Sequence, residues 1–122
     1  MQHSIIQSYQ TGGGSLVGNQ TITGDAEING DVVLAPAAVN VELDVDFKRA
    51  TVQSCALMCT SAATVKTNSS SAPQDTINLS AGQPVILASN AAVLAQFSGD
   101  VTKFFLSCVA GGTFSIRTLL NV

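Results

Sequence analysis

Apolar and polar residues alternate strictly between Val39 and Phe47. The apolar positions are Val39, Val41, Leu43, Val45 and Phe47, and the polar positions between them are Asn40, Glu42, Asp44 and Asp46. Successive side chains of a strand point to opposite sides, so this pattern predicts a β-strand with all five apolar residues on a buried face. Pro36 stands shortly before it, where a strand can begin.

Further β-like segments follow along the chain, separated by turn-forming residues. The predicted strands cover residues 51–60, 62–67, 75–79, 85–88, 101–109 and 113–120, and the predicted turns cover residues 68–74, 81–84, 98–100 and 111–112. Residues 90–97 are rich in alanine and fit either one helical turn or an irregular crossing segment. Many short strands without helical periodicity predict an all-β fold, either a sandwich, a jelly roll or a small barrel.

The first twenty residues differ from the rest because they are polar and rich in glycine. Ile5 and Ile6 form an early apolar pair, and three consecutive glycines at 12–14 interrupt any regular element. We interpret residues 1–20 as an extended arm with a hinge, followed by a β-sandwich domain of residues 21–122.

A short repeat follows the arm. Ile-Thr-Gly-Asp at 22–25 recurs as Ile-Asn-Gly-Asp at 28–31. A period of six residues is also found in β-helices, but two copies are too few to stack into a solenoid. We therefore expect two short strands, each followed by a turn.

Composition indicates an unusual surface. Hydrophobic residues make up 46% of the chain and charged residues only 11%, against about a quarter in ordinary domains. A surface built from Ser, Thr, Asn, Gln, Gly and Ala is easily desolvated and suits extensive protein–protein contacts, although it can also be merely neutral. The five basic residues are scattered and the net charge is −3, so we expect no direct nucleic-acid binding.

The residues needed for catalysis do not converge in the sequence. His3 is the only histidine and lies in the arm, so a Ser–His or Cys–His site would require the arm to fold onto the domain. Cys55, Cys59 and Cys108 are an incomplete ligand set for zinc, and we expect them to be buried free thiols. The glycine run lacks the features of a phosphate-binding loop. We expect no enzyme activity and no cofactor.

Acidic residues could still bind a cation. Glu42, Asp44 and Asp46 share the polar face of their strand, and Asp25, Glu27 and Asp31 are close in sequence. A calcium site is conceivable, but a solvated strand face explains these residues better. Paired acids for glycoside hydrolysis are rejected because nothing indicates that one is buried.

The chain starts without a basic, apolar leader, and no apolar run approaches the roughly 20 residues that span a bilayer. We therefore expect a protein made in a cytoplasm and not associated with a membrane.

The C-terminal half resembles small phage virion proteins of the head decoration or cement type. The stretches that carry the resemblance are residues 64–68, the turn at 81–84, residues 97–105 (Phe-Ser-Gly-Asp-Val-Thr-Lys-Phe-Phe) and residues 116–120 (Ile-Arg-Thr-Leu-Leu). Phage tail and fibre proteins share some of these features. The resemblance implies an antiparallel, jelly-roll-like β-sandwich on the outer surface of a capsid, where it bridges major capsid protein subunits and stabilises the shell.

The resulting hypothesis is a capsid decoration protein of a virion that acts as a homodimer or homotrimer. The expected capsid or subunit contacts are Ile5, Ile6 and Tyr9 in the arm and Asn68, Ser69, Ser70 and Pro73 in the loop at 68–74. Ile5 and Ile6 could instead fill the core of the domain itself. The alternatives are a phage tail, neck or fibre component and, as a further candidate, a soluble ligand-binding β-sandwich.

Overall fold

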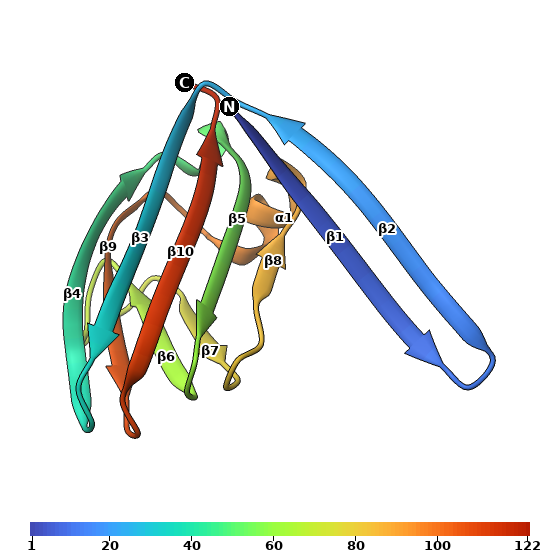
Figure 1. Ribbon diagram of the computed structural model, residues 1–122. Coiled ribbons are helices and arrows are strands. Elements are labelled where there is room, and N and C mark those ends of the chain that lie inside the picture. Colours follow the sequence, from blue (N-terminus) through green and yellow to red (C-terminus); the bar gives the residue numbers. More distant parts are fainter.

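Ten strands account for most of the chain in a computed structural model that describes residues 1–122 (Figure 1). They are β1 (Gln2–Thr11), β2 (Gly14–Thr23), β3 (Ala26–Leu34), β4 (Ala38–Phe47), β5 (Val52–Cys59), β6 (Ala63–Thr67), β7 (Thr76–Leu79), β8 (Val85–Leu87), β9 (Val101–Cys108) and β10 (Gly112–Leu120). A 3-10 turn η1 (Arg49–Thr51) and a helix α1 (Asn90–Gln96) complete the elements. All paired strands are antiparallel, so the prediction of an antiparallel all-β fold is confirmed.

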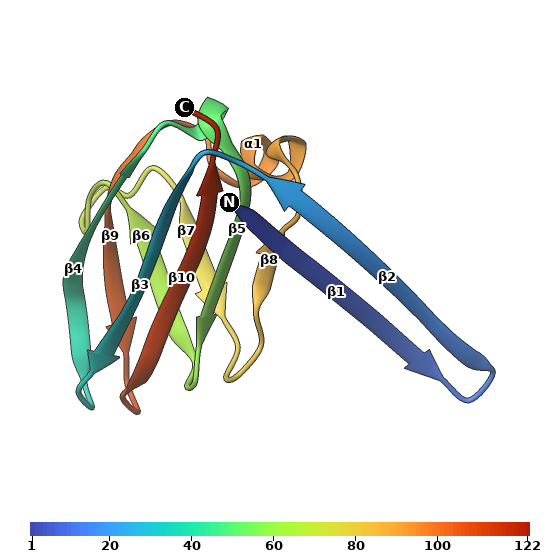
Figure 2. The ribbon, with the colours of Figure 1, turned by 45° about the horizontal axis from the view of Figure 1, so that its top comes forward.

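The strands form three sheets. Two four-stranded sheets, with the orders β3-β10-β5-β8 and β4-β9-β6-β7, face one another across a common core (Figures 1 and 2). The third sheet is the hairpin of β1 and β2, which projects from the end of the sandwich where both termini lie. The helix also lies at this end, whereas the turns after β3, β5, β7 and β9 lie at the opposite end.

The core is a single cluster of 21 buried residues contributed by both sheets and the helix. Four phenylalanines form its aromatic centre: Phe47, Phe97, Phe104 and Phe114. The ring of Phe104 lies 6.3–6.4 Å from the other three, and it joins the two sheets by an edge-to-face contact with Phe114. Edge-to-face pairs at such distances are favourable beyond their buried area.

Strand β4 departs from the predicted alternation. Val45 and Phe47 are buried and Leu43 is half-buried, but Val39 and Val41 are exposed. Asn40 adopts a positive φ of 50° at a shift in the β4–β9 register, and its N–H donates to Ser107 Oγ at 3.0 Å. This bulge adds a residue to one strand and turns Val39 out of the core. The prediction that all five apolar residues share a buried face is therefore wrong.

Residues 89–97 resolve the choice left open between helix and irregular segment. Ser89 Oγ accepts a hydrogen bond from the Ala92 N–H at 3.2 Å, as an N-cap does, and Val93 is buried against the core. The helix has only seven residues, and no helical segment here could cross a membrane.

The N-terminal region differs most from its prediction. Residues 2–23 form a regular hairpin rather than an extended arm with a hinge, and Gly12 and Gly13 are its turn. The prediction that the repeat at 22–31 forms two short strands, each followed by a turn, is also wrong. Gly24 lies between β2 and β3, but Gly30 continues β3 without a turn and packs against Ile116.

Candidate functional site: the hairpin arm and the groove at its base

The arm is an unbroken two-stranded ladder (Figure 1). Ten consecutive residue pairs join Gln2–Thr11 to Gly14–Thr23 without a register shift, and ten residues at about 3.3 Å each make the arm about 33 Å long. Met1 and Gly24 exchange two backbone hydrogen bonds of 3.0 Å at the base. Because hydrogen-bonded pairs alternate along an antiparallel ladder, the odd-numbered residues of β1 bond to β2. The N–H and C=O groups of the even-numbered residues point to the free edge of β1.

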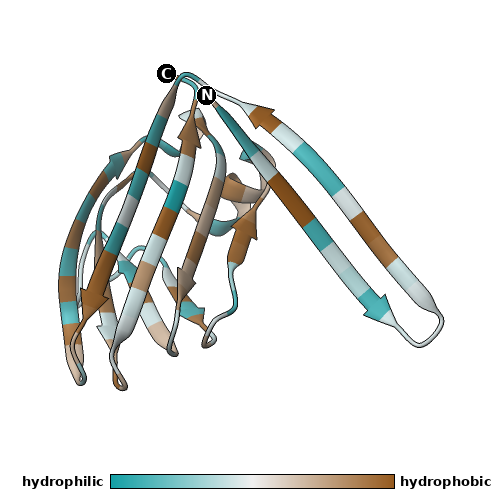
Figure 3. Ribbon diagram, viewed as in Figure 1, coloured by the Kyte–Doolittle hydropathy of each residue, from teal (hydrophilic) through white to brown (hydrophobic).

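The arm contains no Asp, Glu, Lys or Arg, and several of its side chains are apolar (Figure 3). The exposed apolar residues and their exposed fractions are Ile6 (67%), Tyr9 (68%), Leu16 (75%) and Val17 (63%). Tyr9 pairs with Leu16 on one face, whereas Ile6 and Val17 are on the other. Of the predicted contact residues, Ile6 and Tyr9 are therefore exposed and Ile5 is half-buried, and none of the three belongs to the core.

The base of the arm is fixed to the sandwich. Leu119 points outward from β10, yet it is fully buried because the turn at Gly24 covers it. Asp25 forms two hydrogen bonds with the C-terminal end of the chain: its N–H donates to Leu120 O at 2.9 Å, and its carboxylate accepts from the Val122 N–H at 2.8 Å. Gln20 Nε2 also donates to Ala88 O at 3.3 Å. These contacts hold the direction in which the arm leaves the sandwich.

A groove of about 390 Å³ lies between the base of the arm and the outer face of the sheet that contains β5 and β10. Its lining residues are His3, Ser4, Ile5, Ile6, Asn29, Ser54, Cys55, Ala56, Ile86 and Arg117. Half of them are hydrophobic. His3 Nε2 is 3.5 Å from Glu27 Oε1, next to the groove. The groove is therefore lined by apolar and polar side chains in equal number.

Arg117 is held in place on the outer face of the sheet. Its Nη2 donates to both oxygens of Asp31 at 3.1 and 3.3 Å, and its Nη1 donates to Gly30 O at 3.1 Å. A hydrogen bond from Ser115 and, second, the hydrogen bond from Arg117 hold the pKa of Asp31 below its usual value of 3.8. The stabilisation from this carboxylate is present above pH 3.8 and is lost as the pH falls through the lower pKa of the folded state.

We expect Ser115→Ala to raise the pKa of Asp31 toward 3.8, because the ionised carboxylate then loses a hydrogen bond that stabilises it. A carboxyl NMR titration of Asp31 measures the change. The control is Ser107→Ala on the other sheet, which leaves the Asp31 titration unaltered. An unchanged pKa of Asp31 in Ser115→Ala contradicts the assignment.

The loop at 68–74 makes internal contacts. Asn68 adopts a positive φ of 66°, and its amide donates to Gln74 Oε1 at 2.7 Å and to Asp100 O at 2.8 Å. Its Oδ1 accepts from the Thr102 N–H at 2.8 Å. The other predicted contact residues in this loop, Ser69, Ser70 and Pro73, are half-buried. Asn68 thus closes the loop against the start of β9. The loop residues are far in sequence from the predicted contact residues of the arm.

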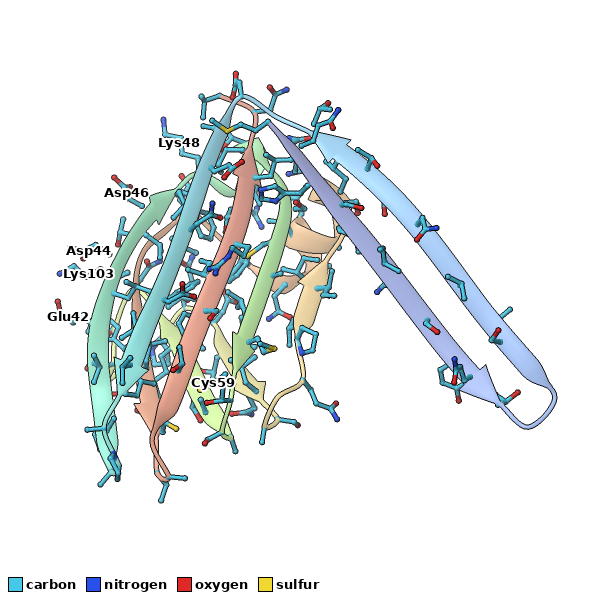
Figure 4. All side chains as sticks on the ribbon, in the orientation of Figure 1. Glu42, Asp44, Asp46, Lys48, Cys59 and Lys103 are labelled. Carbon is cyan, nitrogen blue, oxygen red and sulfur yellow. The ribbon has the colours of Figure 1, made fainter.

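The acidic residues of β4 meet a lysine (Figure 4). Lys103 Nζ is 3.2 Å from Glu42 Oε2 and 3.9 Å from Asp44 Oδ1. The hydrogen bond and charge of Glu42, followed by the charge of Asp44, raise the pKa of Lys103 above its usual value. Asp46 lies at a second irregularity of β4, with a positive φ of 43°. No three His, Cys, Asp or Glu side chains are grouped so that they could hold a metal ion.

All three cysteines are free and buried, as the sequence predicts. Cys55 and Cys59 are on the core side of β5. Burial raises the pKa of the Cys55 thiol to about 11, and a hydrogen bond from Thr118 lowers it in part. Such a thiol is protonated and unreactive at neutral pH.

Sequence reasoning missed Leu16 and Val17 of the arm and Arg117 and Ile86 of the groove. The equal lengths of the segments on either side of Gly12 and Gly13 are the signal that could have revealed the hairpin. No protein-family model, curated protein or solved structure matches this chain.

Proposed function

We propose that the chain is a decoration protein of a phage capsid, which binds the outer surface of the head and bridges major capsid protein subunits. The observation that carries this proposal is the arm. It is about 33 Å long, it is anchored at its base, and it contributes no residue to the 21-residue core.

An isolated two-stranded hairpin is at best marginally stable in water, because it has no partner for either face. Here both faces carry exposed apolar residues, Ile6 and Val17 on one and Tyr9 and Leu16 on the other. The sandwich buries its own core without them. The arm therefore favours a role in contact with another molecule, as expected for a protein that joins subunits.

The order of the remaining strands supports the finer description of the fold. We assign β3–β10 to a jelly roll, since the orders β3-β10-β5-β8 and β4-β9-β6-β7 place strands 3 and 4, 5 and 6, 7 and 8, and 9 and 10 in opposite sheets. Eight-stranded jelly rolls built from two four-stranded sheets are a common architecture of viral capsid domains. This likeness is one of architecture alone.

The surface chemistry agrees with permanent contacts. The arm has no Asp, Glu, Lys or Arg, and its polar residues are Ser, Thr, Asn and Gln together with His3. The cores of protein interfaces are depleted in charged residues, because a charge that loses water on binding must find a partner. An arm without Asp, Glu, Lys or Arg avoids this cost at nearly all of its positions when a neighbouring subunit covers it.

A shortened arm tests the proposal. Deletion of residues 7–10 together with 15–18 removes Tyr9, Leu16 and Val17 but retains the turn and the anchored base. Four residues are lost from each strand, so every remaining side chain keeps its face. We expect the full-length protein to sediment with phage heads that lack it, and the shortened protein to bind at least about tenfold more weakly.

The control is Gln10→Ala, which removes a polar side chain from the same arm and should bind normally. Thermal unfolding checks that the sandwich of the shortened protein remains intact. Equal binding of the shortened and full-length proteins would contradict the role of the arm. If electron microscopy finds the labelled protein on a tail or neck and not on the head, the capsid proposal is wrong and the alternative of a tail or neck component is favoured.

A further inference from the structure

The free edge of β1 lacks the features that keep exposed strand edges from pairing. Natural edge strands are usually short, bulged, or marked by proline or charged residues. Strand β1 has ten residues in an unbroken register, and it contains no proline, no glycine and no Asp, Glu, Lys or Arg. Strand β2 also has a free edge, but Gly14 and Gly18 weaken it as a pairing strand.

The edges of the sandwich provide an internal comparison. Strand β3 carries Glu27 and Asp31, and β4 carries three carboxylates and two irregularities at positive φ. The other two edges, β7 and β8, have only four and three residues. All four sandwich edges are thus protected, and the long edge of β1 is the exception. This contrast indicates that β1 pairs with another strand.

We propose that the partner is the arm of a second copy of this chain, with the two β1 strands antiparallel across a two-fold axis. The even-numbered residues of β1 offer their N–H and C=O groups to the free edge, so they must pair with one another. A two-fold axis at Ile6 uses nearly the whole strand. It pairs Ile6 with its symmetry copy, Ser4 with Ser8, and Gln2 with Gln10, and the two hairpins become one four-stranded sheet.

This arrangement brings the tip of each arm to the base of the other. In the proposed register Tyr9 lies opposite His3 of the second copy, on the face that looks toward the sandwich. His3 and Ile5, on this face, line the groove of about 390 Å³, and Ser4 and Ile6 beside them show that the groove borders the free edge. The only tyrosine of the chain, two-thirds exposed in the single copy, is thereby brought to the groove, whose apolar lining residues include Ala56 and Ile86.

The size of the interface is sufficient for a stable dimer. Five narrow pairs across the two-fold supply about ten backbone hydrogen bonds, which is the number found in a typical specific interface. The two β1 strands contain no Asp, Glu, Lys or Arg that would have to be desolvated. The contact is also isologous, because each copy offers the same edge and the same groove.

The oligomeric state of the isolated full-length protein tests the inference. We expect a dimer at micromolar concentration in analytical ultracentrifugation. Ser8→Pro removes an N–H that points to the free edge and leaves the β1–β2 ladder intact, so it should raise the dimer dissociation constant at least about tenfold. Ser8→Ala, the matched control, should remain dimeric. A monomeric wild type, or a Ser8→Pro protein that dimerises normally, overturns the inference.

Cross-linking tests the register. Residues that face one another in a narrow antiparallel pair have Cα atoms about 5.5 Å apart, within the range of a disulfide. Ile6→Cys should therefore form a linked dimer under mild oxidation, and the native cysteines, being buried, should not. Val17→Cys is the control, because it is similarly exposed on the same face but lies on β2, away from the axis. Linkage through Val17→Cys and not through Ile6→Cys overturns the proposed pairing.

The inference goes beyond the capsid proposal, and the two can fail separately. Dimerisation is measured on the isolated protein, whereas head binding is measured by sedimentation with phage heads. A dimer that does not bind heads contradicts only the proposal that the protein decorates a capsid. A monomer that binds heads contradicts only the proposal that two β1 strands pair.

Discussion

Replacement of Phe104 by alanine should lower the free energy of unfolding by about 3–5 kcal/mol, the usual loss for a buried phenylalanine. Phe104 is fully buried, and its ring contacts Phe47, Phe97 and Phe114. These rings come from both sheets and from the segment after the helix, so the cavity cannot close by a shift of one strand. Small domains are stable by about 5–15 kcal/mol, and the variant should therefore be close to unfolding at 37 °C.

The adjacent residue provides the control. Phe105 is on the outer face of β9, half-buried, opposite Glu42 and Lys66. Phe105→Ala should cost only about 1 kcal/mol, because the ring is partly in water already. Urea unfolding measures both values, provided that the slope with denaturant is unchanged. Equal losses for the two variants would contradict the assignment of Phe104 to the centre of the core.

The sandwich strands after β3 were predictable because their signals are local. Alternation and turn residues placed the strand at 101–109, found as Val101–Cys108, and the strand at 113–120, found as Gly112–Leu120. The strand order depends instead on which strands meet across the core. The bulge at Asn40 depends likewise on a hydrogen bond to Ser107, which lies 67 residues away in the sequence. Neither can be read from neighbouring residues.

The arm escaped prediction for a related reason. Periodicity in a sequence reports burial of one face, and neither face of β1–β2 is buried by the chain itself. Three glycines fit a hinge as well as a hairpin turn. The groove could not be predicted from the sequence either, because its lining residues His3 and Arg117 come from opposite ends of the chain. Ile5, Ile6 and Tyr9 were singled out by their apolar character alone, without the hairpin geometry.

The fixed direction of the arm should depend on Leu119. Leu119→Ala removes a fully buried side chain from beneath the turn at Gly24 and should lower the free energy of unfolding by about 2–4 kcal/mol. The arm should also loosen, because the hydrogen bonds between Met1 and Gly24 and from Asp25 to Leu120 are formed above this side chain. Amide hydrogen exchange of residues 2–25 measures the loosening, and urea unfolding measures the stability.

Val33→Ala is the matched control for Leu119→Ala. Val33 also points outward from the same sheet, on β3, but it is 83% exposed, so its loss should leave stability and exchange nearly unchanged. If Leu119→Ala destabilises the protein while the exchange of the arm stays the same, Leu119 supports the sandwich but does not orient the arm. If stability and exchange of the arm both change, Leu119 also fixes the direction of the arm. The anchored base then allows a hairpin that has no core of its own to hold its free edge in one direction. A partner that must pair along the whole of β1 requires such an edge.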